Sequence, residues 1–571
     1  MNHEELSKQT PYLDNLKPFF WIVGIGFLLY LPTLFFNFSY LDDNNLILDN
    51  QYFLSNPANI FQSFLTDVFH IFNHSAFYYR PLLTISFIFD YQIGGVSPFI
   101  YHFTNIILHL VAASLVFVFF TKLNYKKNIS FLFSIIFLVH PVLTQAVAWI
   151  PGRNDSLLAV FILPTFIFFI KYLTEERRKD LIGCLIFFAL ALFTKESAVF
   201  ALPIMIFYFY FFNRGKGGEK KFLNKLYFTL GSISIVGFWF ILRYFTLKDS
   251  VSATLSEMIK SIFFNFPAVV QFMGKIFFPF NLSVLPIIQD TTFIYGIISI
   301  ILLLTMLFFT KTKRWAYILL GLGWFFAFLL PSFIRPNSAL VADFIEHRLY
   351  VPIIGIFLIL LETDFIKKID LKKRNTLIMA GCLIFIFSVL TVRHSFNFAN
   401  RLAFWNNAAQ NSPHYPLAHR NLGAMEYLVG NLENAEKEFK AALELNPNEE
   451  MAHNNLGLVY VSKGKLKEAE EEYKKELEIN PYYDNAYFNL GLLYFEQKKY
   501  DEAINNWKKT LEINSNYLDA YYALMVFNYE QKNYKEMSVY AEELLKRGVR
   551  PPSEILKSIP SETNSDQKSS F

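Results

Sequence analysis

Long apolar stretches before residue 400 constrain the fold of this chain more than any other feature. Of the 571 residues, 53% are hydrophobic and only 18% are charged, against about 25% charged residues in soluble domains. A helix that crosses a bilayer needs about 20 apolar residues, and its backbone must satisfy its own hydrogen bonds. The sequence therefore predicts an all-α polytopic membrane bundle over residues 19–396 with about eleven spans. These spans are expected at 19–36, 99–120, 130–150, 155–172, 181–194, 198–212, 227–246, 293–310, 315–333, 349–365 and 377–394.

Basic residues fall in every second loop between these stretches, at 122–127, 171–179, 214–225, 311–314 and 367–374. Because Lys and Arg concentrate in cytoplasmic loops, the pattern predicts a cytoplasmic location for these loops and for residues 1–18. Eleven spans then carry the C-terminal region to the opposite side, and residues 37–98 form a long first outer loop. The segment 262–280 contains Pro267 and Lys275, so we expect an amphipathic helix in the outer interface rather than a further span.

The C-terminal region repeats itself every 34 residues. Asn-Leu-Gly recurs at 421, 455 and 489, followed at fixed offsets by an Ala, an aromatic residue and, in the first two copies, a Pro. This period and pattern are typical of tetratricopeptide repeats, which stack as helix pairs into an α-solenoid. We expect the repeats over 397–549, with a half unit at 398–413, and a disordered tail over 550–571. Such an array binds a polypeptide or, as the alternative, serves as a spacer.

The two regions differ in charge. Residues 415–571 hold 19 basic and 26 acidic residues, net −7, whereas residues 1–414 hold 33 basic and 22 acidic residues, net +11. The acidic part is predicted to be solvated, and the basic surplus largely belongs to the cytoplasmic loops. Cys184 and Cys382 both lie in apolar runs, so they predict neither a disulfide framework nor a zinc site.

Polar residues on the expected outer side are the candidates for chemistry, because charge at membrane depth is costly. Asp42 and Asp43 follow the first span directly, and one of them could act as a general base on a hydroxyl. Taken alone, this pair favours a solvated turn. The basic residues expected on the same side suit a phosphate or pyrophosphate, although neighbours could also form ion pairs, Lys195 with Glu196 or Arg348 with Glu346. The phosphate-binding candidates are Arg80, His140, Arg153, Lys195, Arg335, His347 and Arg348.

His102, Asn105 and His109 share one face of the second predicted span, which we expect to look into the bundle. They are not arranged with carboxylates at a recognisable ligand spacing, so no metal site is predicted.

These features form an ordered series along the chain. In order, its members are Asp42-Asp43, Tyr79-Arg80-Pro81-Leu82, Tyr101-His102 with Asn105 and His109, His140-Pro141-Val142-Leu143-Thr144-Gln145-Ala146-Val147 with Gly152-Arg153, Lys195-Glu196, Glu346-His347-Arg348-Leu349-Tyr350-Val351-Pro352, and the repeats. The series resembles the transmembrane and tetratricopeptide repeat-containing O-mannosyltransferases, relatives of the protein O-mannosyltransferases in the GT-C class. One departure is Thr144-Gln145, where the family pattern has Thr-Glu.

The resemblance implies an inverting glycosyltransferase. The sugar, with mannose as one candidate, would pass from a polyprenyl-phosphate carrier to a protein Ser/Thr hydroxyl or another acceptor on the extracytoplasmic face. Asp42 would be the catalytic base with Asp43 beside it, and the basic candidates would hold the lipid phosphate. The repeats would bind the acceptor or a partner polypeptide, and neither a nucleic acid nor a further cofactor is implied.

Two alternatives stay open at this point. The chain could be a non-catalytic, membrane-anchored scaffold whose repeats recruit envelope proteins. Its location could be a bacterial inner membrane with periplasmic repeats, or an endoplasmic reticulum membrane with lumenal repeats.

Overall fold

The computed structural model describes residues 16–39, 41–71, 78–212, 219–247, 254–334 and 344–558. The chain divides into two compact units, Met1–Ser412 and Pro413–Phe571. Helices form the regular structure of the described residues, as the all-α prediction requires.

The first unit contains nineteen α-helices within the described ranges: α1 (Lys17–Tyr30), α2 (Gln51–Ser55), α3 (Asn59–Gln62), α4 (Pro81–Gly94), α5 (Pro98–Lys122), α6 (Lys127–Val139), α7 (Gln145–Ala148), α8 (Arg153–Glu175), α9 (Arg178–Thr194), α10 (Ala201–Phe212), α11 (Glu219–Thr246), α12 (Leu255–Asn265), α13 (Ala268–Phe277), α14 (Ile294–Phe308), α15 (Trp315–Leu329), α16 (Ile353–Leu361), α17 (Asp364–Lys367), α18 (Arg374–Ser395) and α19 (Arg401–Asn411). Short 3-10 or π turns join several of them: η2 (Leu31–Phe35), η3 (Asn44–Leu48), η4 (Pro141–Leu143), η5 (Ile150–Gly152), η6 (Glu196–Phe200), η7 (Leu330–Phe333), η8 (Glu346–Leu349) and η9 (Phe396–Phe398).

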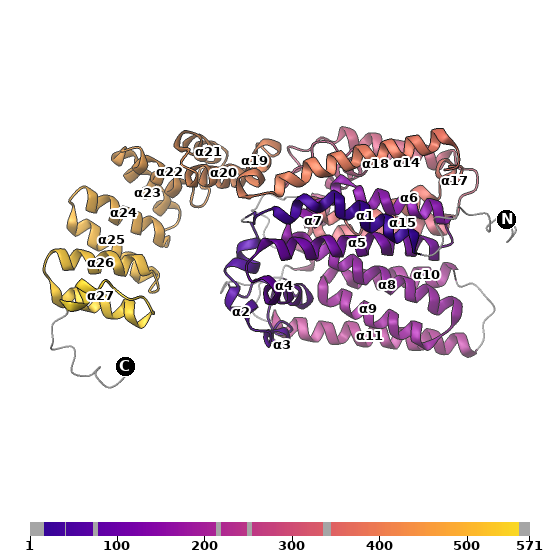
Figure 1. Ribbon diagram of the computed structural model, residues 1–571, viewed down its shortest axis with the longest axis horizontal. Helices are drawn as coiled ribbons and strands as arrows, with labels where there is room; N and C mark the ends of the chain where they lie inside the picture. The colour runs from indigo at the N-terminus through magenta and orange to yellow at the C-terminus, as the bar shows by residue number, and fades with distance from the viewer. Residues whose placement is uncertain are drawn as a thin grey trace. The chain divides into compact units, whose positions relative to one another are not determined.

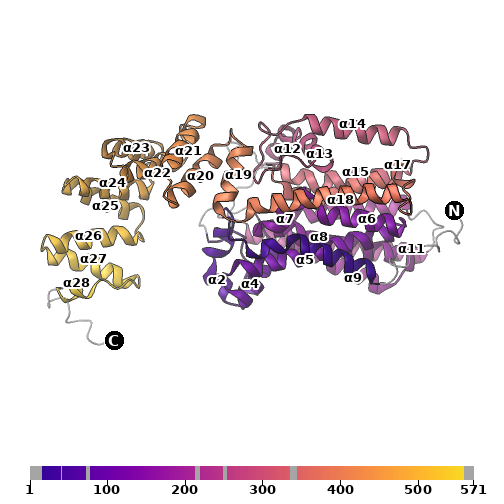
Figure 2. The ribbon, with the colours of Figure 1, turned by 45° about the horizontal axis from the view of Figure 1, so that its top comes forward.

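The long helices of this unit run side by side. α5 packs on α8, α8 on α9 and α9 on α11, so that α11 lies at the edge of the bundle (Figure 1). Helices α2, α3 and α4 lie at one end and α17 at the other (Figure 1). Figure 2 shows α12, α13 and α14 together on one side. At the contact between α13 and α14, a Cβ on Gly296 would overlap the carbonyl oxygen of Val270.

The predicted count of eleven spans is not confirmed. Among the described residues, six helices are long and apolar enough to cross a membrane, or seven if the bent pair Lys127–Val139 and Pro141–Ala148 counts as one span. Several other apolar helices are shorter: α9 has 17 residues, α14 has 15 and α16 has 9. Most of α16 is buried in the hydrophobic core of the unit, which explains why so short a helix is wholly apolar.

The segment 262–280 differs from the single interfacial helix that we expected. It is broken between α12 and α13 at Pro267, which cannot donate the backbone hydrogen bond of a continuous helix. Most of α13 is buried, and the ammonium of Lys275 lies 2.8 Å from the carboxylate of Glu346. The cation that suggested an interfacial helix therefore forms an internal ion pair.

The second unit consists of helix pairs. They are α20 (Pro416–Leu428) with α21 (Leu432–Leu445), α22 (Ala452–Ser462) with α23 (Leu466–Ile479), α24 (Asp484–Glu496) with α25 (Tyr500–Ile513) and α26 (Leu518–Glu530) with α27 (Tyr534–Lys546). In the first three pairs, a glycine at 423, 457 or 491 lies against Phe439, Tyr473 or Trp507 of the second helix. The predicted tetratricopeptide solenoid is confirmed. The glycine of each Leu-Gly motif stands where a side chain would prevent the two helices of a pair from packing together.

Two histidines of this unit occupy equivalent places one repeat apart. The imidazole Nδ1 of His419 lies 2.7 Å from Glu438, and its Nε2 lies 3.0 Å from the carbonyl oxygen of Pro413. His453 has the same contacts, at 2.5 Å to Glu472 and 3.1 Å to the Pro447 carbonyl. In His419, the hydrogen bond to Glu438 raises the pKa of the imidazole.

The edges of the predicted repeat region have their own contacts. Helix α19, in the expected half unit, lies in the first unit, where Asn407 accepts a hydrogen bond from the Val284 amide and Ser412 donates one to the Leu285 carbonyl. Within 550–571, where we expected disorder, residues 550–558 include the short helix α28 (Ser553–Lys557), whose Ile555 packs in an apolar cluster with Met537. Residues 559–571 lie outside the described part.

Candidate functional site

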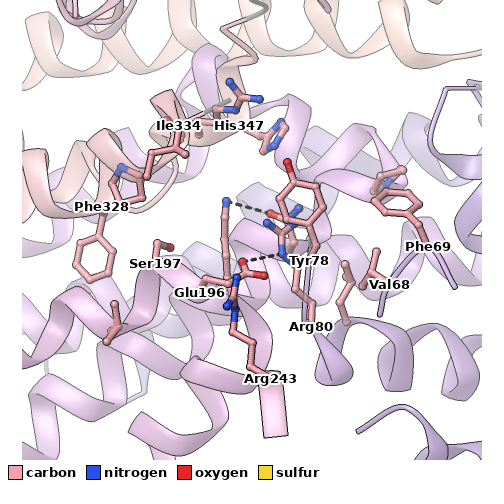
Figure 3. Close-up of a pocket in the computed structure, with 18 of the residues that line it drawn as sticks. Val68, Phe69, Tyr78, Arg80, Glu196, Ser197, Arg243, Phe328, Ile334 and His347 are labelled. Carbon is pink, nitrogen blue, oxygen red and sulfur yellow. Dashed lines mark hydrogen bonds and ion pairs between the residues drawn. The ribbon is translucent and has the colours of Figure 1, made fainter. Parts of the chain in front are cut away.

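A cavity of about 620 Å³ lies where several helix ends of the first unit meet. The starts of α4 and α8 reach it, as do the ends of α9, α11 and α15 and the turn η8. Figure 3 shows lining residues from several of these elements, among them Arg80, Arg243, Phe328 and His347. Its described lining includes four cationic side chains and two carboxylates: Arg80, Lys195, Arg243, Arg348, Asp42 and Glu196. The rest of the wall is largely apolar and aromatic, so the cavity combines a basic region with an apolar one.

The two adjacent aspartates have different environments. Asp42 lines the cavity and is half-buried. Asp43 is only 1% exposed, and its carboxylate accepts hydrogen bonds from the Ser39 amide, at 2.7 Å, and from the Ser39 hydroxyl. The same hydroxyl accepts a bond of 3.0 Å from the indole of Trp149, another lining residue. Asp43 thus stabilises the turn between residues 39 and 43, and Asp42 is the aspartate of the pair that lines the cavity.

Arg80 and Glu196 form one polar element of the cavity wall (Figure 3). Nε of Arg80 lies 3.1 Å from the carboxylate of Glu196, which also accepts the Tyr79 amide at 3.0 Å. The Arg80 guanidinium carbon lies 4.4 Å from the ring centroid of Tyr78. These contacts tie the start of α4 to η6 and hold the guanidinium at the cavity.

Lys195 and His347 meet at Asp155 of α8. The Lys195 ammonium lies 2.7 Å from Asp155, and Nε2 of His347 lies 3.6 Å from the same carboxylate. Burial lowers the pKa of Lys195, although the charge of Asp155 opposes this effect. Burial, and then the nearby cations of Lys195, Arg348 and Arg80, hold the pKa of His347 well below its usual range. Burial and these cations therefore favour the neutral form of the imidazole.

Among the described contacts, neither predicted ion pair between sequence neighbours is present. Lys195 pairs with Asp155 rather than with Glu196, which pairs with Arg80. Glu346 is fully buried, with Lys275 at 2.8 Å and His394 of α18 at 3.2 Å. The turn η8, which carries His347 and Arg348 to the cavity, is thus anchored through Glu346.

Two predicted phosphate-binding residues within the described ranges, Arg153 and His140, do not line the cavity. Arg153 is 0% exposed and lies 2.5 Å from Asp90; it also donates to Asn105 at 2.6 Å and to the Tyr101 carbonyl at 2.8 Å. His140 is buried as well, with its two nitrogens 3.0 Å from the Ile276 carbonyl and 3.3 Å from the Val142 amide. Both side chains have their hydrogen-bonding groups engaged within the fold. Arg335 lies outside the described residues.

His102, Asn105 and His109 are buried inside the unit, as expected for an inward-facing stripe. His109 lies 2.6 Å from the Tyr350 hydroxyl and 2.9 Å from the Leu138 carbonyl, which gives it a structural role. No group of three or more potential metal ligands comes together among the residues that the structure describes.

Sequence reasoning missed the contribution of α11. Trp239, Arg243 and Tyr244 from the end of this helix line the cavity. In Figure 3, Arg243 approaches from the side opposite His347, with Glu196 and Arg80 between them. A single Arg near the end of an apolar helix is an ordinary feature of membrane spans, so no sequence signal distinguished it.

Comparisons with known proteins support the two-part organisation. The family model for dolichyl-phosphate-mannose-protein mannosyltransferases matches residues 83–243, which include α8 and most of α4 and α11. Models for tetratricopeptide repeats match residues 423–464, 457–498 and 485–517.

Curated relatives are named as protein O-mannosyl-transferases. A protein O-mannosyl-transferase of Caenorhabditis elegans is 27% identical over 384 residues, 64% of this chain and 54% of the relative. The protein O-mannosyl-transferase TMTC2 of Mus musculus is 31% identical over 231 residues, 38% of this chain and 27% of the relative. The chain thus aligns with about half, or less, of the length of these relatives. The predicted resemblance to the tetratricopeptide repeat-containing O-mannosyltransferases is confirmed.

Among solved structures, a thermophilic tetratricopeptide-repeat protein of Thermus thermophilus matches 32% of this chain and 90% of its own length, at 17% identity and a TM-score of 0.23.

Proposed function

We propose that this protein is a membrane glycosyltransferase that moves a sugar, with mannose as the first candidate, from a polyprenyl-phosphate donor to a protein Ser or Thr hydroxyl. The observation that carries the proposal is the combination of Asp42 with Arg80, Lys195 and Arg348 around one cavity. A carboxylate can accept the proton of an attacking hydroxyl, and cations can stabilise a departing phosphate. The mannosyltransferase names of the relatives support the same chemistry.

Asp42 acts as the general base in this scheme. The acceptor oxygen forms a bond to the anomeric carbon, and its proton passes to the Asp42 carboxylate. The bond between the anomeric carbon and the phosphate oxygen breaks, and its electron pair leaves with the lipid phosphate. A single displacement of this kind inverts the anomeric centre. Asp43, held by Ser39, fixes the position of Asp42.

The basic residues hold the donor phosphate before and after transfer. The contacts of Arg80 with Glu196 and of Lys195 with Asp155 hold both cations in place without a ligand. Such preorganised charges stabilise the leaving group without reorganisation during the reaction. We assign the phosphate to the cavity-lining residues Arg80, Lys195, His347 and Arg348, and a structural role to Arg153 and His140.

The apolar part of the cavity suits the lipid chain of the donor. Val199, Phe200, Phe328 and Leu247 belong to its wall. The start of α4 lines the cavity. Helices α2 and α4 lie at the end of the unit opposite α17, where Lys367 is one of the basic residues that favour the cytoplasm (Figure 1). We therefore place the reaction on the extracytoplasmic face, periplasmic in a bacterium or lumenal in the endoplasmic reticulum. The tetratricopeptide repeats then bind the protein acceptor or a partner.

A transfer assay with purified protein in lipid nanodiscs tests the proposal. Wild type is incubated with polyprenyl-phosphate-linked mannose and a library of Ser/Thr-containing peptides, and products are identified by mass spectrometry. Loss of a general base costs about 100- to 10,000-fold in rate, so Asp42→Asn should reduce transfer by at least about 100-fold. Asp49→Asn is the matched control, because Asp49 is exposed nearby and does not line the cavity.

Two outcomes contradict the proposal in different ways. Transfer by Asp42→Asn at the wild-type rate shows that Asp42 is not the base. Absence of transfer by wild type with every lipid-linked sugar supplied favours the non-catalytic scaffold, in which the repeats recruit envelope proteins.

A further inference from the structure

We propose that Trp239 and Arg243 of α11 form a binding subsite for the phosphoryl head group of the lipid-linked donor; this inference rests on the proposed function and extends it. The two residues are four positions apart, so they lie on one face of the helix. Both line the cavity. The Arg243 guanidinium carbon lies 5.9 Å from the centroid of the Trp239 ring.

Both side chains carry a buried donor that is not used within the described part of the chain. Nε1 of Trp239 and Nε of Arg243 have no hydrogen-bond acceptor among the described residues. The Trp239 side chain is only 6% exposed, so bulk water does not readily satisfy its N–H. Buried donors without acceptors are rare and destabilising, and each one calls for a specific explanation.

Other cations of the cavity differ from Arg243 in this respect. Nε of Arg80 has Glu196 as its acceptor, and Lys195 has Asp155. The two α11 donors instead lie at the same cavity with Nε1 and Nε unengaged. Two neighbouring donors fit a ligand that brings its own acceptor oxygens.

The chemistry of the pair favours a phosphoryl group. A guanidinium binds phosphate oxygens through charge-assisted hydrogen bonds, and an indole N–H can only donate. A single anionic group with several oxygens can accept from both. A neutral hydroxyl would leave the Arg243 charge without a counter-charge from the ligand.

The position of α11 favours a lipid as the source of this group. The helix lies at the edge of the bundle and packs mainly on α9 (Figure 1). Tyr244, next to Arg243, lines the cavity although it is 58% exposed, so the cavity wall continues onto the outer surface of this apolar helix. A head group attached to a chain in the membrane can reach such a site from the side.

Substitutions that remove one donor at a time test the subsite. Trp239→Phe deletes the indole N–H and keeps an aromatic ring, while Arg243→Gln removes the charge and Arg243→Lys keeps it without the planar fork. The probe is polyprenyl monophosphate in nanodiscs, with binding followed by thermal stabilisation of the protein. The matched controls are Trp315→Phe and Arg393→Lys, because both residues are exposed on other apolar helices and neither lines the cavity.

We expect loss of the charged Arg243 donor to weaken binding more than loss of the neutral Trp239 donor. The Kd for polyprenyl monophosphate should rise about 3- to 10-fold in Trp239→Phe and about 10-fold or more in Arg243→Gln, with Arg243→Lys between wild type and Arg243→Gln. In the transfer assay, the KM for the lipid donor should rise and the KM for the acceptor peptide should not. Both controls should bind as wild type does.

Several results overturn the inference. Wild-type Kd and donor KM in folded Trp239→Phe and Arg243→Gln show that α11 does not bind the head group. A rise in acceptor KM alone assigns the residues to the peptide. Inorganic phosphate that competes at equal concentration with polyprenyl monophosphate argues against a lipid source. A wild type that transfers no sugar but binds polyprenyl monophosphate through α11 refutes the proposed activity and leaves this subsite standing.

Discussion

Replacement of Arg153 by Met separates structural charge from ligand-binding charge in this protein. The sequence suggested Arg153 as a phosphate ligand, yet its guanidinium is 0% exposed and lies 2.5 Å from Asp90. Removing one partner of a buried ion pair costs about 3–5 kcal/mol, because the other charge is left buried and uncompensated. The acceptors on Asn105 and Tyr101 also lose their donor. We therefore expect Arg153→Met to lower the free energy of unfolding by about 4 kcal/mol.

Unfolding in mixed detergent micelles, titrated with SDS and followed by circular dichroism, measures this difference. The double variant Arg153→Met/Asp90→Leu should recover most of the loss, because it removes both charges together. Arg80→Met is the comparison at the cavity. Arg80 and its partner Glu196 are both partly exposed, so we expect a smaller loss of stability and a clear loss of donor binding.

The opposite pattern refutes this reasoning. If Arg153→Met is as stable as wild type and binds polyprenyl monophosphate poorly, Arg153 belongs to the binding site and the buried ion pair has little structural importance. If the double variant is as unstable as the single one, the cost does not come from the orphaned Asp90 carboxylate.

Three further predictions follow from separate parts of the molecule. Gly296→Ala should lower the melting temperature measured by heating in detergent, because its Cβ would overlap a backbone carbonyl oxygen. Gly323→Ala should leave the melting temperature unchanged, because the space around Gly323 is open. The hydrogen bond to Glu438 raises the pKa of His419 in the folded repeats. The stability that this pair contributes should therefore be fully present below the unfolded-state pKa of the histidine and be lost as the pH rises through its folded-state pKa. Urea unfolding across this range should show the decline, and His419→Gln should flatten it. Asp43→Asn keeps an acceptor for Ser39, so its transfer rate should fall about tenfold or less, far less than that of Asp42→Asn, in the nanodisc assay.

The repeats were predictable because their signal is local and periodic. Leu-Gly at a spacing of 34 marks the contact of Gly457 with Tyr473, and each repeat contacts mainly its neighbours. The span count was not predictable in the same way. The apolar sequence of α16 fits a membrane span and a helix buried in protein equally well. Only the packing of α16 in the core shows that protein surrounds it.

The sequence identified several residues of the site by their residue type and by the expected side of the membrane, but it did not identify their ion-pair partners. Lys195 has an extended backbone, so its side chain and that of Glu196 point in different directions. Each therefore pairs with a residue distant in sequence, Asp155 for Lys195 and Arg80 for Glu196. The sequence favours Arg153 rather than Arg243 as a phosphate ligand, whereas the fold places Arg153 in a buried ion pair and Arg243 at the cavity.

The most direct test of the central claim is the glycosylation of extracytoplasmic proteins in cells. Mass spectrometry compares cells that carry wild type, a gene deletion or Asp42→Asn, with Asp49→Asn as the control. We predict that a set of Ser/Thr-linked hexoses is present with wild type and Asp49→Asn and lost in both the deletion and Asp42→Asn. Identical glycosylation in the deletion and in wild type would contradict the account.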